Sequence, residues 1–265
     1  MNQFYTKTNV SNNMYAILNN KIDLNSFDIL LEPSAGTGSF FKLMNKNKRV
    51  GIDLEPKCDG VKKCNFFDYT FIPNKKYAVI GNPPFGKRCS TAIKFFNRSA
   101  MYADLIAFII PRTFKRVSVQ NRLNLYFELI HSIDLPTKPC CFEPKMKAKC
   151  CFQIWIRRTK PRKITRLTKK HKDFDFIKLG RKDENNQPTK PVEAHFGIVA
   201  YGGECGRITF DDSMCAKNCH WIKSNIDIDL LIKRFNSLDY SISKDTVRQN
   251  SIGRGELVHL YSNHY

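Results

Sequence analysis

The stretch Glu32-Pro33-Ser34-Ala35-Gly36-Thr37-Gly38-Ser39-Phe40 lies between a short apolar run and a second apolar cluster. Two glycines separated by one residue let the backbone turn sharply and approach a ligand closely. The stretch lacks the Gly-Lys-Ser/Thr ending of a P-loop and the third glycine of a dinucleotide-binding fingerprint. It therefore predicts a strand–turn–helix unit that binds a nucleoside-bearing ligand without a pyrophosphate.

Apolar runs on both sides of this stretch alternate with amphipathic segments. The expected strands cover 28–31, 49–54, 77–80, 105–110, 129–135 and 151–156, and the expected helices cover 14–18, 40–44 and 90–102. Apolar strands that alternate with helices are typical of a mostly parallel sheet with helices on both faces. We expect a Rossmann-like α/β domain over residues 1–160, followed by a small basic α+β region over 161–265.

A second motif, Asn82-Pro83-Pro84-Phe85, follows the expected strand 77–80. The carboxyl ends of strands are where open α/β sheets bind ligands. The prolines have fixed φ, so the side-chain oxygen of Asn82 and the carbonyl of Pro83 form a rigid pair of acceptors suited to an amino group. Phe85 offers a face on which an aromatic ring can stack. Asp53, at the end of another strand, is placed to bind ribose hydroxyls.

The net charge of +20, from 44 Lys and Arg against 24 Asp and Glu, favours a polyanionic partner such as nucleic acid. Residues 145–172 hold 12 of the basic residues and no acidic one, with Phe152, Trp155 and His171 interleaved. We expect this stretch to be a nucleic-acid track beside the ligand site, although a solvated linker or surface strand has the same composition.

The remaining composition excludes several classes of protein. No apolar run approaches the roughly 20 residues of a membrane span, and no secretory signal is recognised at the N-terminus. Ten cysteines without such a signal are typical of reduced thiols, so we expect an intracellular, reducing compartment, cytoplasm or nucleus. The cysteines and histidines show no zinc-ligand spacing, and we expect no metal.

Together, EPSAGTGSF and the later GNPPF resemble the S-adenosylmethionine-dependent methyltransferases that act on amino groups, particularly the N6-adenine methyltransferases of nucleic acid. The order Phe4-Tyr5-Thr6, EPSAGTGSF, NPPF and then a variable region resembles the gamma group of DNA adenine methylases, over residues 3–158. The resemblance implies a class I methyltransferase domain, S-adenosylmethionine as cofactor, a flipped target adenine and a C-terminal target-recognition region.

The resemblance also implies roles for individual residues. The catalytic tetrad is Asn82, Pro83, Pro84 and Phe85, and no general base is obligatory. Phe142, followed by Lys145, Lys147 and Lys149, matches the aromatic that stacks on the target base with Phe85; Phe152 competes for that role. The implied cofactor contacts are Tyr5, Thr6, Glu32, Ser34, Ala35, Gly36, Gly38, Asp53, Leu54, Phe67, Asp68 and Asn82.

Several alternatives stay open. RNA adenine methylases share the NPPF motif, and a basic surface suits RNA as well as DNA. DNA is expected as the substrate only because of the order of the motifs. A protein-glutamine methylase typically has Tyr at the position of Phe85, and a catalytically inactive nucleic-acid-binding subunit would not need Asn82, Gly36, Gly38 and Asp53 intact. Both a monomer and a subunit that needs a specificity partner are compatible with the sequence.

Overall fold

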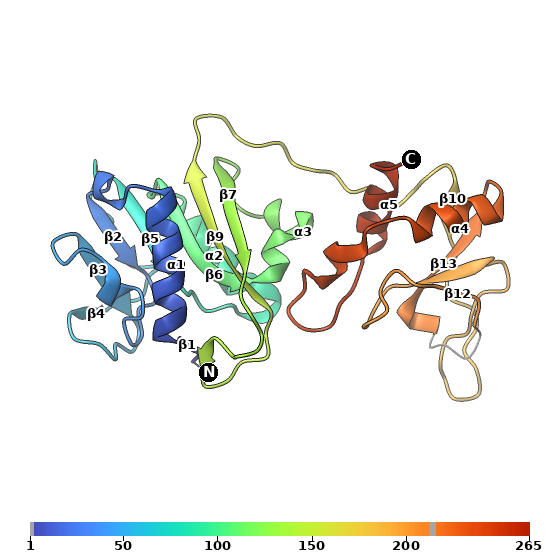
Figure 1. Cartoon of the computed structure of the whole chain (residues 1–265), viewed down its shortest axis with the longest axis horizontal. Helices are drawn as coiled ribbons and strands as arrows, with labels where there is room; N and C mark the ends of the chain where they lie inside the picture. The colour runs from blue at the N-terminus through green and yellow to red at the C-terminus, as the bar shows by residue number, and fades with distance from the viewer. Residues whose placement is uncertain (1–2, 212–215) are drawn as a thin grey trace. The chain divides into compact units, whose positions relative to one another are not determined.

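The computed structural model describes residues 3–211 and 216–265, which divide into two compact units at Ile164/Thr165 (Figure 1). The elements of the first unit are β1 (Tyr5–Thr6), α1 (Thr8–Lys21), β2 (Ile29–Glu32), β3 (Arg49–Asp53), β4 (Val61–Lys63), β5 (Tyr77–Gly81), α2 (Ser90–Ser99), β6 (Leu105–Pro111), α3 (Val117–Gln120), β7 (Phe127–Asp134), β8 (Phe142–Glu143) and β9 (Cys150–Arg157). Those of the second unit are β10 (Phe174–Phe176), β11 (Phe196–Val199), β12 (Ile208–Thr209), β13 (Cys219–Ser224), α4 (Ile228–Asn236) and α5 (Arg254–Ser262).

The large sheet of the first unit has the strand order β4-β3-β2-β5-β6-β9-β7. Strands β4, β3, β2, β5 and β6 run parallel, and β9 is antiparallel to both of its neighbours. The order reverses between β2 and β5, which is the topological switch point of a doubly wound sheet. This mostly parallel, doubly wound sheet confirms the predicted α/β fold class. Its switch point places the loops that follow β2 and β5 side by side.

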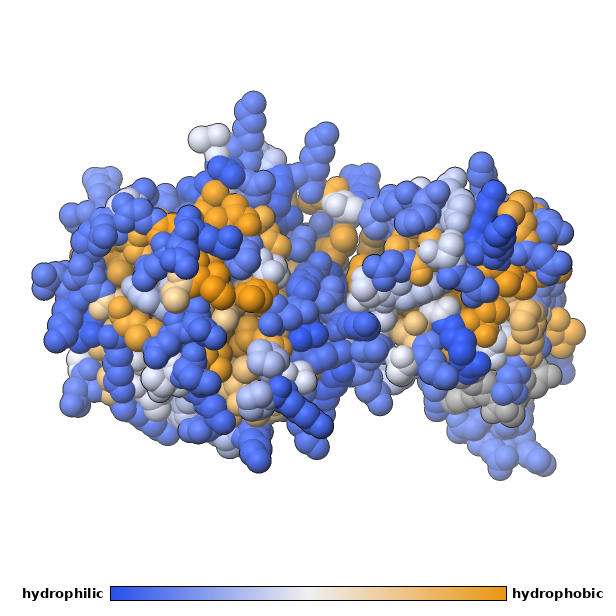
Figure 2. Space-filling view, in the orientation of Figure 1, coloured by the Kyte–Doolittle hydropathy of each residue, from blue (hydrophilic) through white to orange (hydrophobic). Residues whose placement is uncertain are grey.

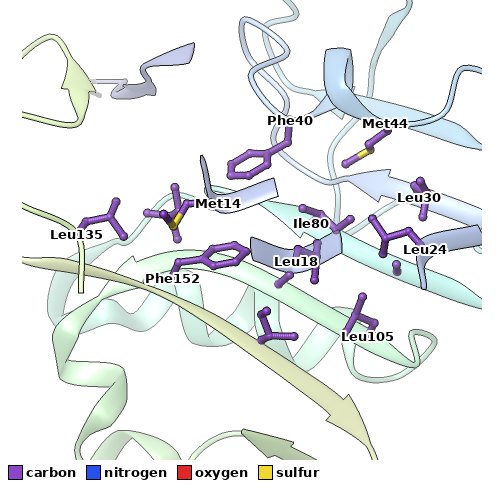
Figure 3. Packing of buried hydrophobic residues seen from close by; sticks show 14 of the residues in the cluster. Met14, Leu18, Leu24, Leu30, Phe40, Met44, Ile80, Leu105, Leu135 and Phe152 are labelled. Atoms are coloured by element: carbon purple, nitrogen blue, oxygen red, sulfur yellow. The ribbon is translucent and has the colours of Figure 1, made fainter. Parts of the chain in front are cut away.

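Helices cover both faces of this sheet, as predicted. On one face, Met14 and Leu18 of α1 pack with Ile80 of β5 in the main hydrophobic cluster (Figure 3). On the opposite face, Phe96 of α2 makes an edge contact with Trp155 of β9, at 5.3 Å between ring centroids. Strands buried on both sides are apolar along their whole length, which is why they read as continuous runs in the sequence.

The helix expected over 40–44 is instead a single 3₁₀ turn, Phe41–Leu43. The backbone N–H of Phe41 donates to the carboxylate of Glu32 at 2.6 Å, which fixes the start of the turn by a side chain from β2. Asn45 then accepts from the backbone N–H of Asn47 and begins a new turn. The chain therefore leaves the glycine loop through one short turn before it enters β3.

The second unit is α+β, with the antiparallel sheet order β10-β13-β11-β12. Its core is rich in aromatic residues, among them Phe174, Phe235 and Tyr261. The buried carboxylate of Asp173 accepts from Arg234 at 2.8 Å and from the Tyr261 hydroxyl at 2.9 Å, so it ties α4 and α5 to the start of the sheet.

The visible face of each unit is mostly hydrophilic, with hydrophobic residues showing in patches (Figure 2). Within residues 3–211 and 216–265, no helix combines the length and the apolar character that crossing a membrane requires.

Candidate functional site

The glycine loop after β2 is closed by the acid at the end of β3. Gly36 has φ +49° and Gly38 has φ +78°, both in the left-handed region that favours glycine. The backbone N–H of Gly36 donates to Oδ2 of Asp53 at 2.8 Å. A Cβ on Gly36 would lie 2.7 Å from Cε1 of Tyr5, so the ring of Tyr5 occupies the space beside the turn. The sequence placed these residues in one ligand site, and the structure brings them into contact.

Two apolar side chains near the loop are exposed to solvent, one directly after β3 and one in the segment after β4. Oδ1 of Asp53 accepts from the backbone N–H of Glu55 at 2.8 Å, which orients the carboxylate and leaves lone pairs on both oxygens for a ligand. Leu54 is 63% exposed and Phe67 is 39% exposed. Asp68 is exposed, and its Oδ2 accepts from the side chain of Asn65 at 2.9 Å. The arrangement offers carboxylates next to uncovered apolar surface, as an adenosine needs.

Glu32 stabilises the backbone that follows the glycine loop. Its side chain is buried, and Oε2 accepts from the backbone N–H of Phe41. Burial raises the pKa of the Glu32 carboxyl well above its ordinary value, and the backbone N–H groups of Phe41 and Phe40 oppose that rise. Ala35 is also buried, so these two predicted cofactor residues shape the loop.

Asn82, directly after β5, is fixed by residues from two other segments. Its Nδ2 donates to Oγ1 of Thr6 at 3.1 Å and to the carbonyl of Phe4 at 3.4 Å. A carbonyl oxygen can only accept, so these bonds set the orientation of the amide and leave Oδ1 available as an acceptor. The hydroxyl of Ser34 donates to the backbone carbonyl of Asn82 at 3.2 Å and joins the glycine loop to the second motif across the switch point.

The rest of the second motif is held in a tight loop. Pro83 is buried, Pro84 is exposed and Phe85 is half-buried against the core. The backbone N–H of Ala92 in α2 donates to the carbonyl of Phe85 at 3.2 Å, which closes the segment between them.

The expected stacking role of Phe142 is not compatible with its position. Phe142 is 3% exposed, lies in β8 opposite Thr6 of β1, and belongs to the main hydrophobic cluster. Its competitor Phe152 is completely buried in β9, stacked on Phe40 at 6.4 Å. Phe85 is therefore the aromatic of the three that keeps part of its surface exposed.

The single basic track expected over 145–172 also needs correction, because β9 lies inside it. Cys150 pairs with Pro111 at the carboxyl end of β6, whereas Ile156 pairs with Leu105 at its other end. Eight strand residues span about 24 Å, so residues 145–149 and 158–164 leave opposite edges of the sheet. Lys145, Lys147 and Lys149 lie at the edge that carries Asn82.

Arginines of the same stretch serve the fold. Arg162 donates from Nη2 to the carbonyl of Gln120 at 2.6 Å and from Nε to that of Phe127 at 2.9 Å. Arg157 donates to the carbonyls of Ala103 and Ala100. These cations are committed to backbone acceptors within the first unit.

Tyr5 and Thr6 were predicted from the sequence, but Ser39 and the strand pairing that clamp them beside the glycine loop were not. The hydroxyl of Ser39 donates to the carbonyl of Thr6 at 2.8 Å, and β1 pairs with β8 across more than 130 residues of chain. A two-residue strand has no periodicity to detect. For Ser39 the one signal in the sequence was its position, a polar residue directly after the second glycine.

No family model matches the sequence, and a search of curated proteins finds no match. Among solved structures, the chain is similar to a proposed RNA methyltransferase of Pyrococcus horikoshii, with 14% identity, a TM-score of 0.43 and coverage of 59% of this chain and 87% of that one. It is also similar to the 23S rRNA methyltransferase ErmE, with 14% identity, a TM-score of 0.41 and coverage of 59% and 71%. A proposed class I S-adenosylmethionine-dependent methyltransferase of Listeria monocytogenes gives 15% identity, a TM-score of 0.45 and coverage of 60% and 63%.

Proposed function

We propose that the protein transfers the methyl group of S-adenosylmethionine to the exocyclic N6 of adenine in DNA. The observation that carries this proposal is the fixed amide of Asn82 at the switch point, joined through Ser34 to a glycine loop that ends on Asp53. This constellation offers two acceptors for an amino group directly beside a site suited to a nucleoside.

The residues present fit S-adenosylmethionine. Asp53 is oriented to accept from the ribose hydroxyls, and the exposed side chains of Leu54 and Phe67 offer apolar surface to the adenine ring. The glycine loop, closed by Tyr5, would hold the methionine end. When bound, the cofactor supplies an activated methyl group on its sulfonium; the protein supplies position and electrostatics.

The acceptor pair accounts for the choice of an amino group as substrate. The lone pair of an adenine N6 is delocalised into the ring, so the free amine is a poor nucleophile. Hydrogen bonds from the amino group to Oδ1 of Asn82 and to the carbonyl of Pro83 would favour a pyramidal nitrogen, whose lone pair is then free to act as a nucleophile. Such positioning is worth up to roughly 7–11 kcal/mol in well-oriented systems, and no general base is needed.

A base inside a duplex cannot reach these acceptors, so we infer that the target adenine is flipped and stacks on Phe85. The cost of unstacking is a few kcal/mol, which contacts from basic residues to phosphates offset. We assign target recognition to the second unit, and DNA is favoured over RNA by the order of the motifs. RNA is the second candidate because NPPF also occurs in RNA adenine methylases.

The experiment offers methyl-labelled S-adenosylmethionine with duplex DNA, single-stranded DNA and RNA in parallel, and identifies the methylated base by mass spectrometry. The expected product is N6-methyladenine in DNA. Label found in RNA alone would overturn the DNA assignment and leave the chemistry standing. Cofactor binding without transfer to any of the three would refute the enzymatic function.

A further inference from the structure

The segment directly after Phe85 has an unusual backbone. Gly86 has φ +69°, and two successive non-glycine residues, Arg88 at +51° and Cys89 at +62°, follow it in the left-handed region. Such conformations are uncommon outside glycine, and they cluster at ligand-binding sites where the surrounding structure holds them in place.

This segment is held at both ends. The bond between the N–H of Ala92 and the carbonyl of Phe85 closes the loop, and the buried thiol of Cys89 is hydrogen-bonded to Oγ1 of Thr113 at 3.0 Å. Because Cys89 is anchored inward, the two residues before it stay on the surface. Lys87 and Arg88 are both exposed.

Among residues 3–211 and 216–265, Lys87 and Arg88 form no ion pair with a carboxylate. The next basic turn differs in this respect, because Asp134 pairs with Lys115 at 2.6 Å and with Arg112 at 3.5 Å. Two uncompensated cations are therefore held by a constrained loop within three residues of Phe85.

The same edge of the sheet continues this positive surface. The backbone N–H of Arg112 donates to the carbonyl of Lys149 at 3.0 Å, so the basic turn after β6 adjoins the segment that leads into β9. Lys145 and Lys147 of that segment are exposed and, in the described part of the chain, also have no carboxylate partner. The other half of the edge carries the carboxylates of Asp53 and Asp68.

We propose that Lys87 and Arg88 bind the backbone phosphates next to the target nucleotide, with Lys145 and Lys147 extending the same contact along the strand. This inference rests on the proposed function and names the surface that holds its substrate. A guanidinium can bind a phosphate through two parallel hydrogen bonds, which fixes position as well as charge. Phosphates bound this close to Phe85 position the flipped base beside Asn82.

The test compares two double variants with the same loss of charge. One is Lys87→Ala with Arg88→Ala; the control is Lys160→Ala with Lys163→Ala, two exposed lysines beyond the opposite end of β9. Fluorescence anisotropy measures the Kd for a labelled DNA duplex and a labelled RNA at several salt concentrations, without cofactor turnover. Affinity for S-adenosylmethionine, measured in parallel, confirms that each variant is folded.

For Lys87→Ala with Arg88→Ala we expect a roughly tenfold weaker Kd at low salt. The slope of log K against log salt should fall by about 1.4–1.8, as the loss of two phosphate contacts requires. The control should stay near wild type. Arg88→Lys should keep the salt slope but bind more weakly than wild type, because it retains the charge without the bidentate contact.

Two results would overturn the inference and are distinguishable from each other. If the wild type binds nucleic acid but the Lys87/Arg88 variant keeps its Kd and salt slope, the phosphate contact is wrong and the proposed function stands. If the wild type binds neither DNA nor RNA at low salt, both the contact and the proposed function are wrong.

Discussion

Replacement of Gly36 by alanine is expected to distort the cofactor loop while the large sheet stays folded. Alanine at φ +49° carries the left-handed penalty of about 1–2 kcal/mol. Its Cβ would also lie 2.7 Å from Cε1 of Tyr5, so the ring must move by about 0.7 Å to reach an ordinary contact of 3.4 Å. Tyr5 belongs to a two-residue strand, so this displacement is expected to open the clamp while the large sheet stays intact.

The matched control is Gly60→Ala. Gly60 has φ +82°, but a Cβ there would meet only the ring of Phe41, at 3.4 Å or more. In both variants the free energy of unfolding should fall by about 1–2 kcal/mol. For a chain of this size, each kcal/mol lowers Tm by roughly 2–4 °C.

Isothermal titration calorimetry with S-adenosylmethionine distinguishes the two variants. We expect Gly36→Ala to weaken binding by at least about tenfold, or ~1.4 kcal/mol, and Gly60→Ala to bind like wild type. Equal affinities in the two variants would refute the placement of the cofactor in this loop.

Three further predictions follow from buried or half-buried groups. Because the folded-state pKa of Glu32 is raised, wild-type stability should fall as pH rises from about 4.5 through that pKa, and urea unfolding of Glu32→Gln should show a weaker pH dependence; identical slopes would contradict this. Cys58, whose Sγ lies against Gly38, should be protected by S-adenosylmethionine from alkylation, as peptide mass spectrometry can measure; an unchanged rate would argue against the site. Asp173→Ala should destabilise the second unit by about 2–3 kcal/mol in a denaturation experiment, because it removes the buried acceptor that Arg234 and the Tyr261 hydroxyl share, while cofactor affinity stays at the wild-type value; a loss below about 1 kcal/mol would contradict this.

The strands were predictable because burial on both faces leaves a continuous apolar run. The runs at 77–80 and 105–110 differ from β5 and β6 by one residue each. The glycine loop and the Asn82 motif could be placed at one edge for a topological reason, since the carboxyl ends of parallel strands share that edge.

Strand direction was not predictable from the same signal. Residues 151–156 read as a strand, but a fully buried run looks the same whether it is parallel or antiparallel. The antiparallel direction of β9 splits the basic stretch between two edges of the sheet, which composition alone could not reveal.

The pairing of β1 with β8 and the burial of Phe142 arise from tertiary contacts. Two-residue strands carry no pattern, and an isolated phenylalanine beside lysines is equally compatible with a stacking residue and a core residue. The bond from Asn82 to Thr6 depends on that pairing. The sequence therefore indicated which residues form the site, but it did not reveal the contacts that orient them.

The most direct test of the central claim is the effect of Asn82→Ala on cofactor affinity and on methyl transfer, measured on the same preparation. Removal of the amide removes one acceptor for the amino group and the bonds to Thr6 and Phe4. We predict that S-adenosylmethionine binding falls by less than about tenfold, whereas formation of N6-methyladenine falls by about 100-fold or more. Transfer within about threefold of wild type would contradict the role of Asn82 as the acceptor that aims the adenine amino group.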